Sequence, residues 1–391
     1  MGSPDQQGYS TLWRLAPPSL PVLPVHAGHA GHAGSATGSP GEGQPVNELN
    51  TIDSFGRPLR ALRISVTDRC NLRCGYCMPE QEYRWLPRSE LLSFEEIGRL
   101  VDVFIDLGVQ RVRLTGGEPL LRRDLASLVA ELSGRSGLKD IALTTNAVRL
   151  PGQVEALRAA GLQRVTVSVD SLRPERFFEL TRRDELSATL AGIDAAVGGG
   201  FRSVKMNTVV MRGRNDDELA ALIAFAEERG IEPRFIEYMD VGGATRWSQA
   251  EVVPASEILA RVTEELGAPE PLEPSEGRGS APAQRFRLPN GFVFGVIAST
   301  TSPFCGACDR ARLTADGRFF TCLYAREGMD LRALCRNGAT REEIQSALSE
   351  RWGARRDRGA EERLQLNERG ALAGIGELRD DPHLEMHTRG G

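Results

Sequence analysis

Residues 59 to 237 alternate between two patterns of hydrophobic positions. Short runs of apolar and β-branched residues are typical of buried strands, and the stretches between them repeat apolar residues every three or four positions, as amphipathic helices do. The predicted strands span residues 62–66, 109–115, 141–145, 164–170, 203–210 and 234–238. The predicted helices include residues 94–108, 124–133, 154–161 and 218–230.

This alternation predicts a parallel sheet whose strands are joined by right-handed crossovers. Six repeats of strand and helix fit a partial or full α/β barrel, or a doubly wound sheet. In each of these folds the ligand site lies at the carboxyl ends of the strands. Polar motifs that directly follow a predicted strand are therefore the first candidates for chemistry.

The termini and one internal segment carry weaker patterns. Residues 1–50 hold 8 Gly and 7 Pro with only four charged residues, which predicts a disordered tail, and its His26, His29 and His32 fit a solvated segment better than a metal site. Residues 268–284 are rich in Pro, Gly and Ser. We therefore expect a tail at 1–50, a barrel at 51–267, a linker or loop at 268–284 and a C-terminal region at 285–391.

Within the C-terminal region the sequence predicts one hairpin and little else. Asn290 and Gly291 lie between two apolar runs in residues 286–299, as in a tight β-hairpin. The charged stretch 352–381 predicts a helical surface or a flexible insertion. Residues 386–391 are too polar for us to expect a core element there.

Composition and charge narrow the class of protein. The chain has 48 Lys and Arg against 53 Asp and Glu, a net charge of −5, so no basic excess indicates nucleic-acid binding. No run of about 18 apolar residues predicts a membrane span, and no signal peptide is recognisable. We therefore expect a cytoplasmic protein with reduced cysteines.

Six of the seven cysteines fall into two groups of three. They are Cys70, Cys74 and Cys77, spaced C-x3-C-x2-C after the first predicted strand, and Cys305, Cys308 and Cys322, spaced C-x2-C-x13-C. Structural zinc sites and cubane iron–sulfur clusters normally take four protein ligands. Three thiolates leave one iron of a cubane open to a small molecule. Cys335 has no partner at such a spacing and is expected to be a buried thiol.

Plainer interpretations of the two triplets are zinc hooks or redox pairs. The position of the first triplet after a strand favours an iron–sulfur cluster there. For the second triplet, zinc and iron–sulfur stay equally open from the spacing alone. A zinc-stabilised binding module without catalysis is therefore one alternative function.

The first triplet, with an aromatic residue before its last cysteine, resembles the radical S-adenosylmethionine enzymes. The chain is more narrowly similar to the molybdenum cofactor biosynthesis protein A family, the GTP 3′,8-cyclases, over roughly residues 52–350. The matching segments are residues 62–79, 111–125, 143–147, 165–172, 204–213, 234–239 and 305–323, together with Gly390 and Gly391. This resemblance implies a partial (β/α)6 TIM-like barrel with a C-terminal region that carries a second iron–sulfur cluster.

The resemblance also implies the cofactors and the reaction. These are two [4Fe-4S] clusters and S-adenosylmethionine, which binds the open iron of the first cluster and is cleaved to a 5′-deoxyadenosyl radical. The radical takes a hydrogen from C3′ of GTP, and C3′ then bonds to C8, giving (8S)-3′,8-cyclo-7,8-dihydroguanosine 5′-triphosphate for molybdenum cofactor synthesis. The open iron of the second cluster is implied to take the guanine base. A radical enzyme that modifies a peptide is a further alternative.

The residues implied by the family pattern follow the predicted strands. The adenosylmethionine contacts are Tyr76, Gly117, Ser168 and Met239. Gly117 belongs to a Gly-Gly run in which the backbone can come close to a ligand. The GTP contacts are Arg63, Arg111, Arg113, Thr144, Lys205, Arg234, Arg310, Ala311 and Arg312. The catalytic residues implied by the family are Cys70, Cys74, Cys77, Arg310 and Arg312.

A physical argument supports phosphate binding by these arginines taken together. A guanidinium binds phosphate oxygens bidentately, and a charge within a strand, such as that of Arg63, is costly unless it is paired or ligated. For any single arginine, a salt-bridged surface position is an equally good interpretation. Two departures from the family are Arg111, where Lys is frequent, and Ala147, where Gly is usual.

The expected partners are GTP, a reducing protein such as flavodoxin or ferredoxin, and the downstream cyclic pyranopterin monophosphate synthase. No nucleic acid and no membrane are expected, and a homodimer is one option that the sequence leaves open. The family's Gly-Gly tail is implied to reach into the site, and Gly390 and Gly391 match it, although the residues before Gly390 are atypical of the family. The sequence assigns no role to residues 1–50 or 352–381.

Overall fold

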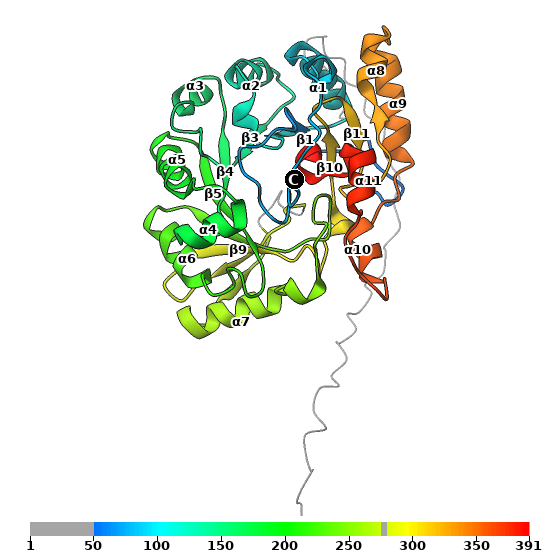
Figure 1. The fold of residues 1–391 in the computed structure, drawn as a ribbon. Coiled ribbons are helices and arrows are strands. Elements are labelled where there is room, and N and C mark those ends of the chain that lie inside the picture. The colour runs from blue at the N-terminus through cyan, green and yellow to red at the C-terminus, as the bar shows by residue number, and fades with distance from the viewer. Residues whose placement is uncertain (1–50, 275–279, 391) are drawn as a thin grey trace, which may run out of the picture. The chain divides into compact units, whose positions relative to one another are not determined.

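The computed structural model describes residues 51–274 and 280–390, which contain one twelve-stranded sheet surrounded by helices (Figure 1). The strands are β1 (Ala61–Ser65), β2 (Arg111–Thr115), β3 (Asp140–Thr145), β4 (Arg164–Ser168), β5 (Ser203–Val210), β6 (Glu232–Glu237), β7 (Glu270–Leu272), β8 (Gln284–Arg287), β9 (Val293–Ile297), β10 (Arg310–Leu313), β11 (Arg318–Phe320) and β12 (Met329–Asp330). The helices are α1 (Phe94–Asp106), α2 (Leu125–Ser133), α3 (Val154–Ala159), α4 (Pro174–Thr181), α5 (Leu186–Gly198), α6 (Leu219–Glu228), α7 (Ala255–Leu266), α8 (Leu331–Arg336), α9 (Arg341–Gly353), α10 (Gly359–Leu364), α11 (Ile375–Asp380) and α12 (Met386–Arg389).

The sheet is a partial parallel barrel, as predicted. Its order is β12-β11-β10-β1-β2-β3-β4-β5-β6-β9-β8-β7, and the run from β10 to β9 is parallel throughout. The outermost strands, β12 with β11 and β7 with β8, are antiparallel. Because the two ends of this order do not pair, the described barrel stays open on one side.

The C-terminal strands extend the same sheet at both of its ends. β10 adds to β1, and β9 adds to β6 and pairs with β8 across the predicted hairpin, in which Gly291 has φ 90°. The short strand β7 lies inside the segment expected to be a linker. The boundaries proposed between barrel, linker and C-terminal region therefore stay predictions.

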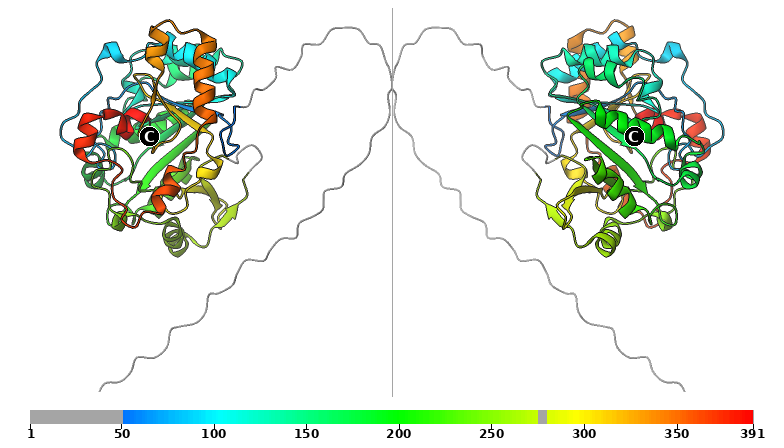
Figure 2. Two further views of the ribbon diagram at one scale, coloured as in Figure 1. Left: turned by 90° about the vertical axis from the view of Figure 1, so that its right-hand side faces the viewer. Right: turned by 90° about the vertical axis from the view of Figure 1, so that its left-hand side faces the viewer.

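The strands alternate between an apolar outer face and a polar inner face. On β1, Leu62 and Ile64 are fully buried in the hydrophobic core, whereas Arg63 between them lies on the opposite face. β2 repeats this pattern around Arg113, which pairs in register with Arg63. The helices cover the outer face (Figures 1 and 2). The apolar area buried there stabilises the barrel, and the inner face is left for polar chemistry.

The expectation for the last residues is wrong. α12 is buried inside the barrel, with His387, Thr388 and Arg389 only 4%, 1% and 1% exposed. Polar residues can fill this space because many of their groups find hydrogen-bond partners there. The Thr388 hydroxyl lies within hydrogen-bond distance of the carbonyls of Pro382 and Glu385 and donates to one of them, and the Arg389 guanidinium donates to the carbonyl of Leu323.

Other expectations outside the barrel repeats can be compared with the structure. The stretch 352–381 contains α10 and α11, so its helical interpretation is confirmed, and Cys335 is buried as expected. In the described part of the chain, no helix is long and apolar enough to cross a bilayer. The predicted disordered tail at 1–50 lies outside the described residues, as do residues 275–279 of the predicted linker.

Ala147, where the family usually has glycine, lies in a turn with a left-handed backbone conformation. Ala147 has φ 63° and is fully buried after β3, in a conformation that glycine adopts more easily. Gly192 in α5 makes room for this turn, because a side chain there would clash with the carbonyl oxygen and methyl group of Ala147. The turn after β3 is therefore kept by a glycine on a neighbouring helix.

We expect Gly192→Ala to lower the free energy of unfolding by about 1 to 3 kcal/mol, because the added methyl group overpacks the Ala147 turn. Gly198→Ala in the same helix is the matched control, since nothing lies within 4 Å of a side chain at Gly198. The control should unfold at the same or a slightly higher urea concentration. Equal urea midpoints for the two variants would refute this account of the turn.

Candidate functional site

The first cysteine triplet lies in the loop that follows β1. Cys70, Cys74 and Cys77 are all partly buried, and the Cys77 amide donates to the Cys74 carbonyl at 2.9 Å. The end of α4 holds the loop, because the amides of Arg73 and Gly75 donate to the carbonyls of Thr181 and Leu180. The loop is thus a fixed part of the barrel mouth.

The thiols of this triplet lie in surroundings that disfavour the thiolate. Burial, followed by the charge of Glu118, raises the pKa of Cys70 to about 11, and burial raises the pKa of Cys74 and of Cys77. No cationic side chain compensates enough to reverse these shifts. A bound metal would supply the positive charge that makes such thiols deprotonate.

The Gly-Gly run after β2 packs directly under the cysteine loop. The Gly117 amide donates to the Thr67 carbonyl at 2.8 Å, and the Glu118 amide donates to the Arg69 carbonyl at 2.7 Å. A side chain at Gly117 would clash with the backbone of Arg69. Glycine is required here by this close approach, and the predicted contact of Gly117 with a cofactor stays a prediction.

Glu118 and Asp170 are buried carboxyl groups that sequence reasoning missed. Glu118 accepts hydrogen bonds from the Thr145 hydroxyl and the Asn146 amide, each at 2.7 Å, and burial raises its pKa to about 7. The Tyr76 hydroxyl donates to Asp170 at 2.8 Å, and burial raises the pKa of Asp170 to about 6. The signal for Asp170 was its position just past the end of β4.

The other predicted cofactor contacts are spread around the mouth. Ser168 ends β4 and pairs in register with Asn207 on β5. The Asn207 Oδ1 atom is buried and has no hydrogen-bond partner in the described part of the chain, which is what a polar ligand would satisfy. Met239 packs against the apolar cluster of Val241, Tyr324 and Ala360, against which Cys305 and Cys322 also pack.

The second triplet is assembled from segments around β10, β11 and α10. Cys305 and Cys308 precede β10, and Cys322 follows β11. Backbone amides at the start of α10 donate toward the thiols of Cys305 and Cys322. The charged stretch 352–381 thus has a place at the site, which its composition did not indicate.

The three thiols of the second triplet differ in charge environment. Burial raises the pKa of Cys305 and of Cys322. Burial opposes ionisation of Cys308 as well, but the charges of Arg310 and Arg355 outweigh it and lower its pKa to about 7. The Cys308 thiol is therefore partly ionised near neutral pH, before any metal binds.

Two buried arginines fix the backbone of the second cysteine loop. Arg57 donates to the Cys305 carbonyl and Arg355 to the Cys308 carbonyl, each at 2.9 Å. Asp53 binds both guanidinium groups. Sequence reasoning missed these three residues because no spacing links residues 53 and 57 to residue 355.

The thiol donor sets fit iron–sulfur clusters better than zinc. Within residues 51–274 and 280–390, no three Cys, His, Asp or Glu side chains are placed to hold one metal ion together. A tetrahedral zinc ion needs its sulfur ligands about 2.3 Å from a single centre. An iron–sulfur cluster distributes its thiolates over several irons. A triplet that held a cubane would bind three separate irons and would not need to converge on one ion.

Arginines gather on the inner face between the two triplets. Arg63 pairs in register with Arg113 and with Arg312. Burial, followed by the charges of Arg312, Arg310, Arg113 and Arg234, holds the pKa of Arg63 well below its ordinary value. The pKa values of Arg113 and Arg312 are likewise lowered, to about 9 and about 10. These side chains are close enough to repel one another.

No carboxylate neutralises most of this cluster. Among the described residues, Arg63, Arg113, Arg310 and Arg312 make no ion pair, and Arg113 donates instead to the hydroxyls of Thr144 and Thr166. We call these four residues the lumen arginines. Buried charges without counter-charges are costly, so the cluster is suited to an anion.

The remaining predicted substrate residues are placed differently. Arg111 is paired with Asp309, and Lys205 is paired with Glu232 at 2.5 Å. Arg234 donates to the Thr166 hydroxyl at 3.3 Å. The Ala311 side chain points into the core, so any contact of Ala311 with a substrate would come from its backbone.

The tail reaches the lumen arginines. The Gly390 carbonyl accepts hydrogen bonds from Arg312 at 3.2 Å and from Arg63 at 3.5 Å. Gly390 has φ 67°, and a side chain there would clash with Thr115, so only glycine fits. Gly391, the other residue of the family's tail motif, lies outside the described residues.

An ion pair anchors the segment before the tail. His383 lies between Asp316, at 2.6 Å from Nε2, and Asp381, at 2.9 Å from Nδ1. Burial opposes protonation of His383, but the bonds to the two carboxylates outweigh it and raise its pKa. The Arg389 guanidinium also donates to the His383 carbonyl, which links this pair to the tail.

Comparison with known families divides the chain in two. Residues 64–226 match the family model of the Radical SAM superfamily, and residues 231–361 match that of Molybdenum Cofactor Synthesis C. The first match contains the first cysteine triplet, and the second contains the second.

Similar curated proteins cover most of the chain. GTP 3′,8-cyclase 1 of Mycobacterium tuberculosis H37Rv is 50% identical and covers 89% of this chain and 97% of its own length. GTP 3′,8-cyclase of Acidothermus cellulolyticus is 51% identical over 79% of this chain and 87% of its own. That of Aquifex aeolicus is 46% identical over 81% of this chain and 95% of its own.

Solved structures share the fold at low identity. Streptococcus suis SuiB bound to S-adenosylmethionine covers 74% of this chain and 68% of its own, with 18% identity and a TM-score of 0.52. SuiB bound to the precursor peptide SuiA covers 80% and 68%, with 18% identity and a TM-score of 0.53. At this identity the likeness supports the barrel fold alone.

We expect the His383 ion pair to stabilise the protein in a pH-dependent way. Because the pKa of His383 is raised, its contribution is complete below the ordinary histidine pKa of about 6.5 and is lost as pH rises through the raised value. His383→Gln should cost about 1 to 2 kcal/mol at pH 6 and less at pH 9, measured by urea unfolding. Asp316→Asn should show the same pH dependence, and the double variant should cost no more than either single one. A cost that is equal at both pH values would contradict the pairing.

Proposed function

This chain belongs to the GTP 3′,8-cyclase family of radical S-adenosylmethionine enzymes, and we propose that its lumen arginines bind the triphosphate of the substrate. The enzyme converts GTP to (8S)-3′,8-cyclo-7,8-dihydroguanosine 5′-triphosphate in molybdenum cofactor biosynthesis, using two [4Fe-4S] clusters and S-adenosylmethionine.

The observation that supports triphosphate binding is the uncompensated charge of the lumen arginines. The four guanidiniums lie on neighbouring strands, Arg312 buried and the others partly buried, and make no ion pair within the described residues. A triphosphate presents several negative oxygens in a row, and guanidinium groups bind such oxygens bidentately. Burial, followed by the charges of neighbouring arginines, lowers the pKa values of Arg63, Arg113 and Arg312, and a bound anion would offset both effects.

The first triplet would hold the cluster that handles S-adenosylmethionine. When bound there, this pair of cofactors supplies a 5′-deoxyadenosyl radical after one-electron reduction. Tyr76, Gly117, Ser168 and Met239 would orient the cofactor. Tyr76 is itself held by its bond to Asp170, and the unsatisfied oxygen of Asn207 beside Ser168 adds a polar contact.

The second triplet would hold the other cluster on the opposite side of the lumen arginines. Arg310 and Arg312 follow Cys308 directly on β10, so the base of GTP would lie beside this cluster while the phosphates reach the arginines. Met239 packs against the same apolar cluster as Cys305 and Cys322, which links the two cofactor regions. Held at both ends, the ribose would present C3′ to the radical source in a near-attack geometry.

Two predicted GTP contacts, Arg111 and Lys205, are ion-paired and would adjust the strength of GTP binding. Arg111 and Lys205 are held by Asp309 and Glu232, so they would contribute to GTP binding through their positive potential or after exchange of partner. The Gly390 carbonyl, which accepts from Arg63 and Arg312, fixes the direction of both guanidiniums.

We also propose two protein partners, an electron donor and the enzyme that takes up the product. A reduced flavodoxin or ferredoxin would supply electrons, and cyclic pyranopterin monophosphate synthase would consume the product. We propose a cytoplasmic enzyme, with a homodimer as its candidate oligomeric state.

The decisive experiment is an anaerobic incubation with GTP, S-adenosylmethionine and dithionite, followed by mass spectrometry. We expect 5′-deoxyadenosine and the 3′,8-cyclised nucleotide from the wild type, and neither from Cys70→Ala. Cys335→Ala is the matched control, because this buried thiol lies outside both triplets. Formation of 5′-deoxyadenosine by Cys70→Ala would reject the assignment of the first cluster.

We expect Arg312→Ala to weaken GTP binding by about 10- to 100-fold, the loss of one charge-assisted contact of about 1.5 to 3 kcal/mol. The measurement is GTP affinity by equilibrium binding, with uncoupled cleavage of S-adenosylmethionine followed in parallel. Uncoupled cleavage should stay largely intact, and Arg312→Lys should recover part of the affinity. An unchanged GTP affinity would remove Arg312 from the substrate site.

A further inference from the structure

A second group of arginines lines a cleft of about 700 Å³ on the outside of the barrel mouth. We call it the arginine cleft, and its basic residues are Arg69, Arg88, Arg122, Arg123 and Arg149. They come from the loops after β1, β2 and β3 and from the short turn before α1. The single acidic residue in its lining is Asp124, which precedes α2.

The positive charge of the arginine cleft is uncompensated. Arg69, Arg88, Arg123 and Arg149 are exposed, and none of them makes an ion pair in the part of the chain that the structure describes. Burial and the charge of Arg88 lower the pKa of Arg122, so these like charges lie close together.

A neighbouring surface arginine is neutralised. Arg336 pairs with Glu96 and also donates to the carbonyl of Leu91, a residue that lines the cleft. In a protein of net charge −5, an unpaired basic cluster of this kind is a local exception. Such a patch attracts and orients an acidic partner.

The cleft shares its backbone with the first cysteine triplet. Arg69 directly precedes Cys70, and its carbonyl accepts a hydrogen bond from the Glu118 amide. Arg149 follows Asn146 in the loop after β3. The side-chain nitrogen Nδ2 of Asn146 lies 3.9 Å from the Cys70 sulfur. A protein seated in the cleft would therefore touch the loops that hold the first cluster.

We propose that the arginine cleft is the docking surface for an acidic one-electron carrier protein that reduces the first cluster. This inference rests on the proposed function, which requires an electron at that cluster. In the step, the reduced carrier loses one electron and the cluster gains it, and no bond or proton is exchanged. The substrate polyanion already has its own site at the lumen arginines, and the exposed arginines on separate loops suit a broad acidic surface.

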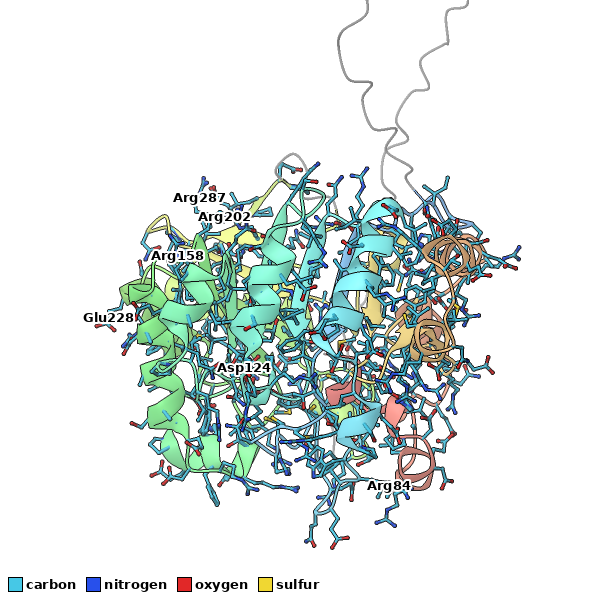
Figure 3. All side chains as sticks on the ribbon, turned by 90° about the horizontal axis from the view of Figure 1, so that it is seen from above. Arg84, Asp124, Arg158, Arg202, Glu228 and Arg287 are labelled. Carbon is cyan, nitrogen blue, oxygen red and sulfur yellow. The ribbon has the colours of Figure 1, made fainter. Side chains whose placement is uncertain are left out.

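Charge reversal tests the proposal on the cluster-loaded enzyme. The test variant is Arg88→Glu/Arg123→Glu, with Arg149→Glu as an independent second variant. The matched control is Arg287→Glu, an exposed arginine that makes no ion pair among the described residues. Figure 3 shows Arg287 near one end of the barrel and Arg84, in the loop after β1, near the opposite end, with Asp124 of the cleft away from Arg287.

The first measurement is the affinity for an oxidised acidic flavodoxin, titrated at several salt concentrations. We expect the double variant to bind at least tenfold more weakly than wild type and to show a smaller dependence on salt, because fewer charges are paired at the interface. Arg287→Glu should bind as wild type does. The second measurement is activity, which should fall when flavodoxin is the limiting reductant and stay unchanged with dithionite.

Other results would overturn either the docking proposal or the proposed function. Equal flavodoxin affinity for the double variant and Arg287→Glu overturns the docking proposal, as does a loss of dithionite-driven activity in the cleft variants. Loss of binding to inorganic tripolyphosphate with unchanged flavodoxin affinity would make the cleft a small-anion site and also overturn it. Absence of dithionite-driven activity in the wild type would instead refute the proposed function, while the affinity measurement would still judge the cleft.

Discussion

Electrostatic repulsion among the lumen arginines is the constraint around which the structure is organised. Arg63, Arg113, Arg310 and Arg312 lie on neighbouring strands in a buried space, and burial together with their mutual charge lowers the pKa values of three of them. A barrel can hold such a cluster only because its outer face buries a continuous apolar core under the helices. The inner face is thereby free to favour an anionic ligand over an empty state.

The two cysteine triplets offer the same ligands, but the second contains one thiol, Cys308, whose electrostatic setting is opposite to that of the first triplet. The first lies beside the buried carboxyl groups Glu118 and Asp170, and burial with their charge keeps its thiols protonated. The second lies beside Arg310 and Arg355, which bring Cys308 close to ionisation. Charge near a cluster is one of the factors that set its reduction potential. The chain therefore gives two similar clusters different electronic surroundings, in keeping with one taking part in electron transfer and the other in substrate binding.

The sequence predicted what depends on neighbours in the chain and missed what depends on distant ones. Strands and helices of the repeats follow from local hydrophobic periodicity, and both cysteine triplets are visible from their spacing. The brace of Arg57 and Arg355, the amides of α10 and the ion pair of Lys205 with Glu232 join segments that only the folded barrel brings together. The tail was misjudged for a related reason: a polar segment is expected at the surface unless the interior itself is polar, as it is around Gly390.

The sheet order also bears on how the chain acquires its structure during synthesis. β1 lies between β2 and β10, so Ala61 has one neighbour in Arg111 and the other in Arg310. A ribosome-bound chain therefore leaves one edge of its first strand without hydrogen bonds until nearly the whole barrel has emerged, and a bare strand edge invites pairing with other chains. Maturation of the first cysteine loop, which directly follows β1, would accordingly begin on a half-built sheet and finish only when the last parallel strand arrives.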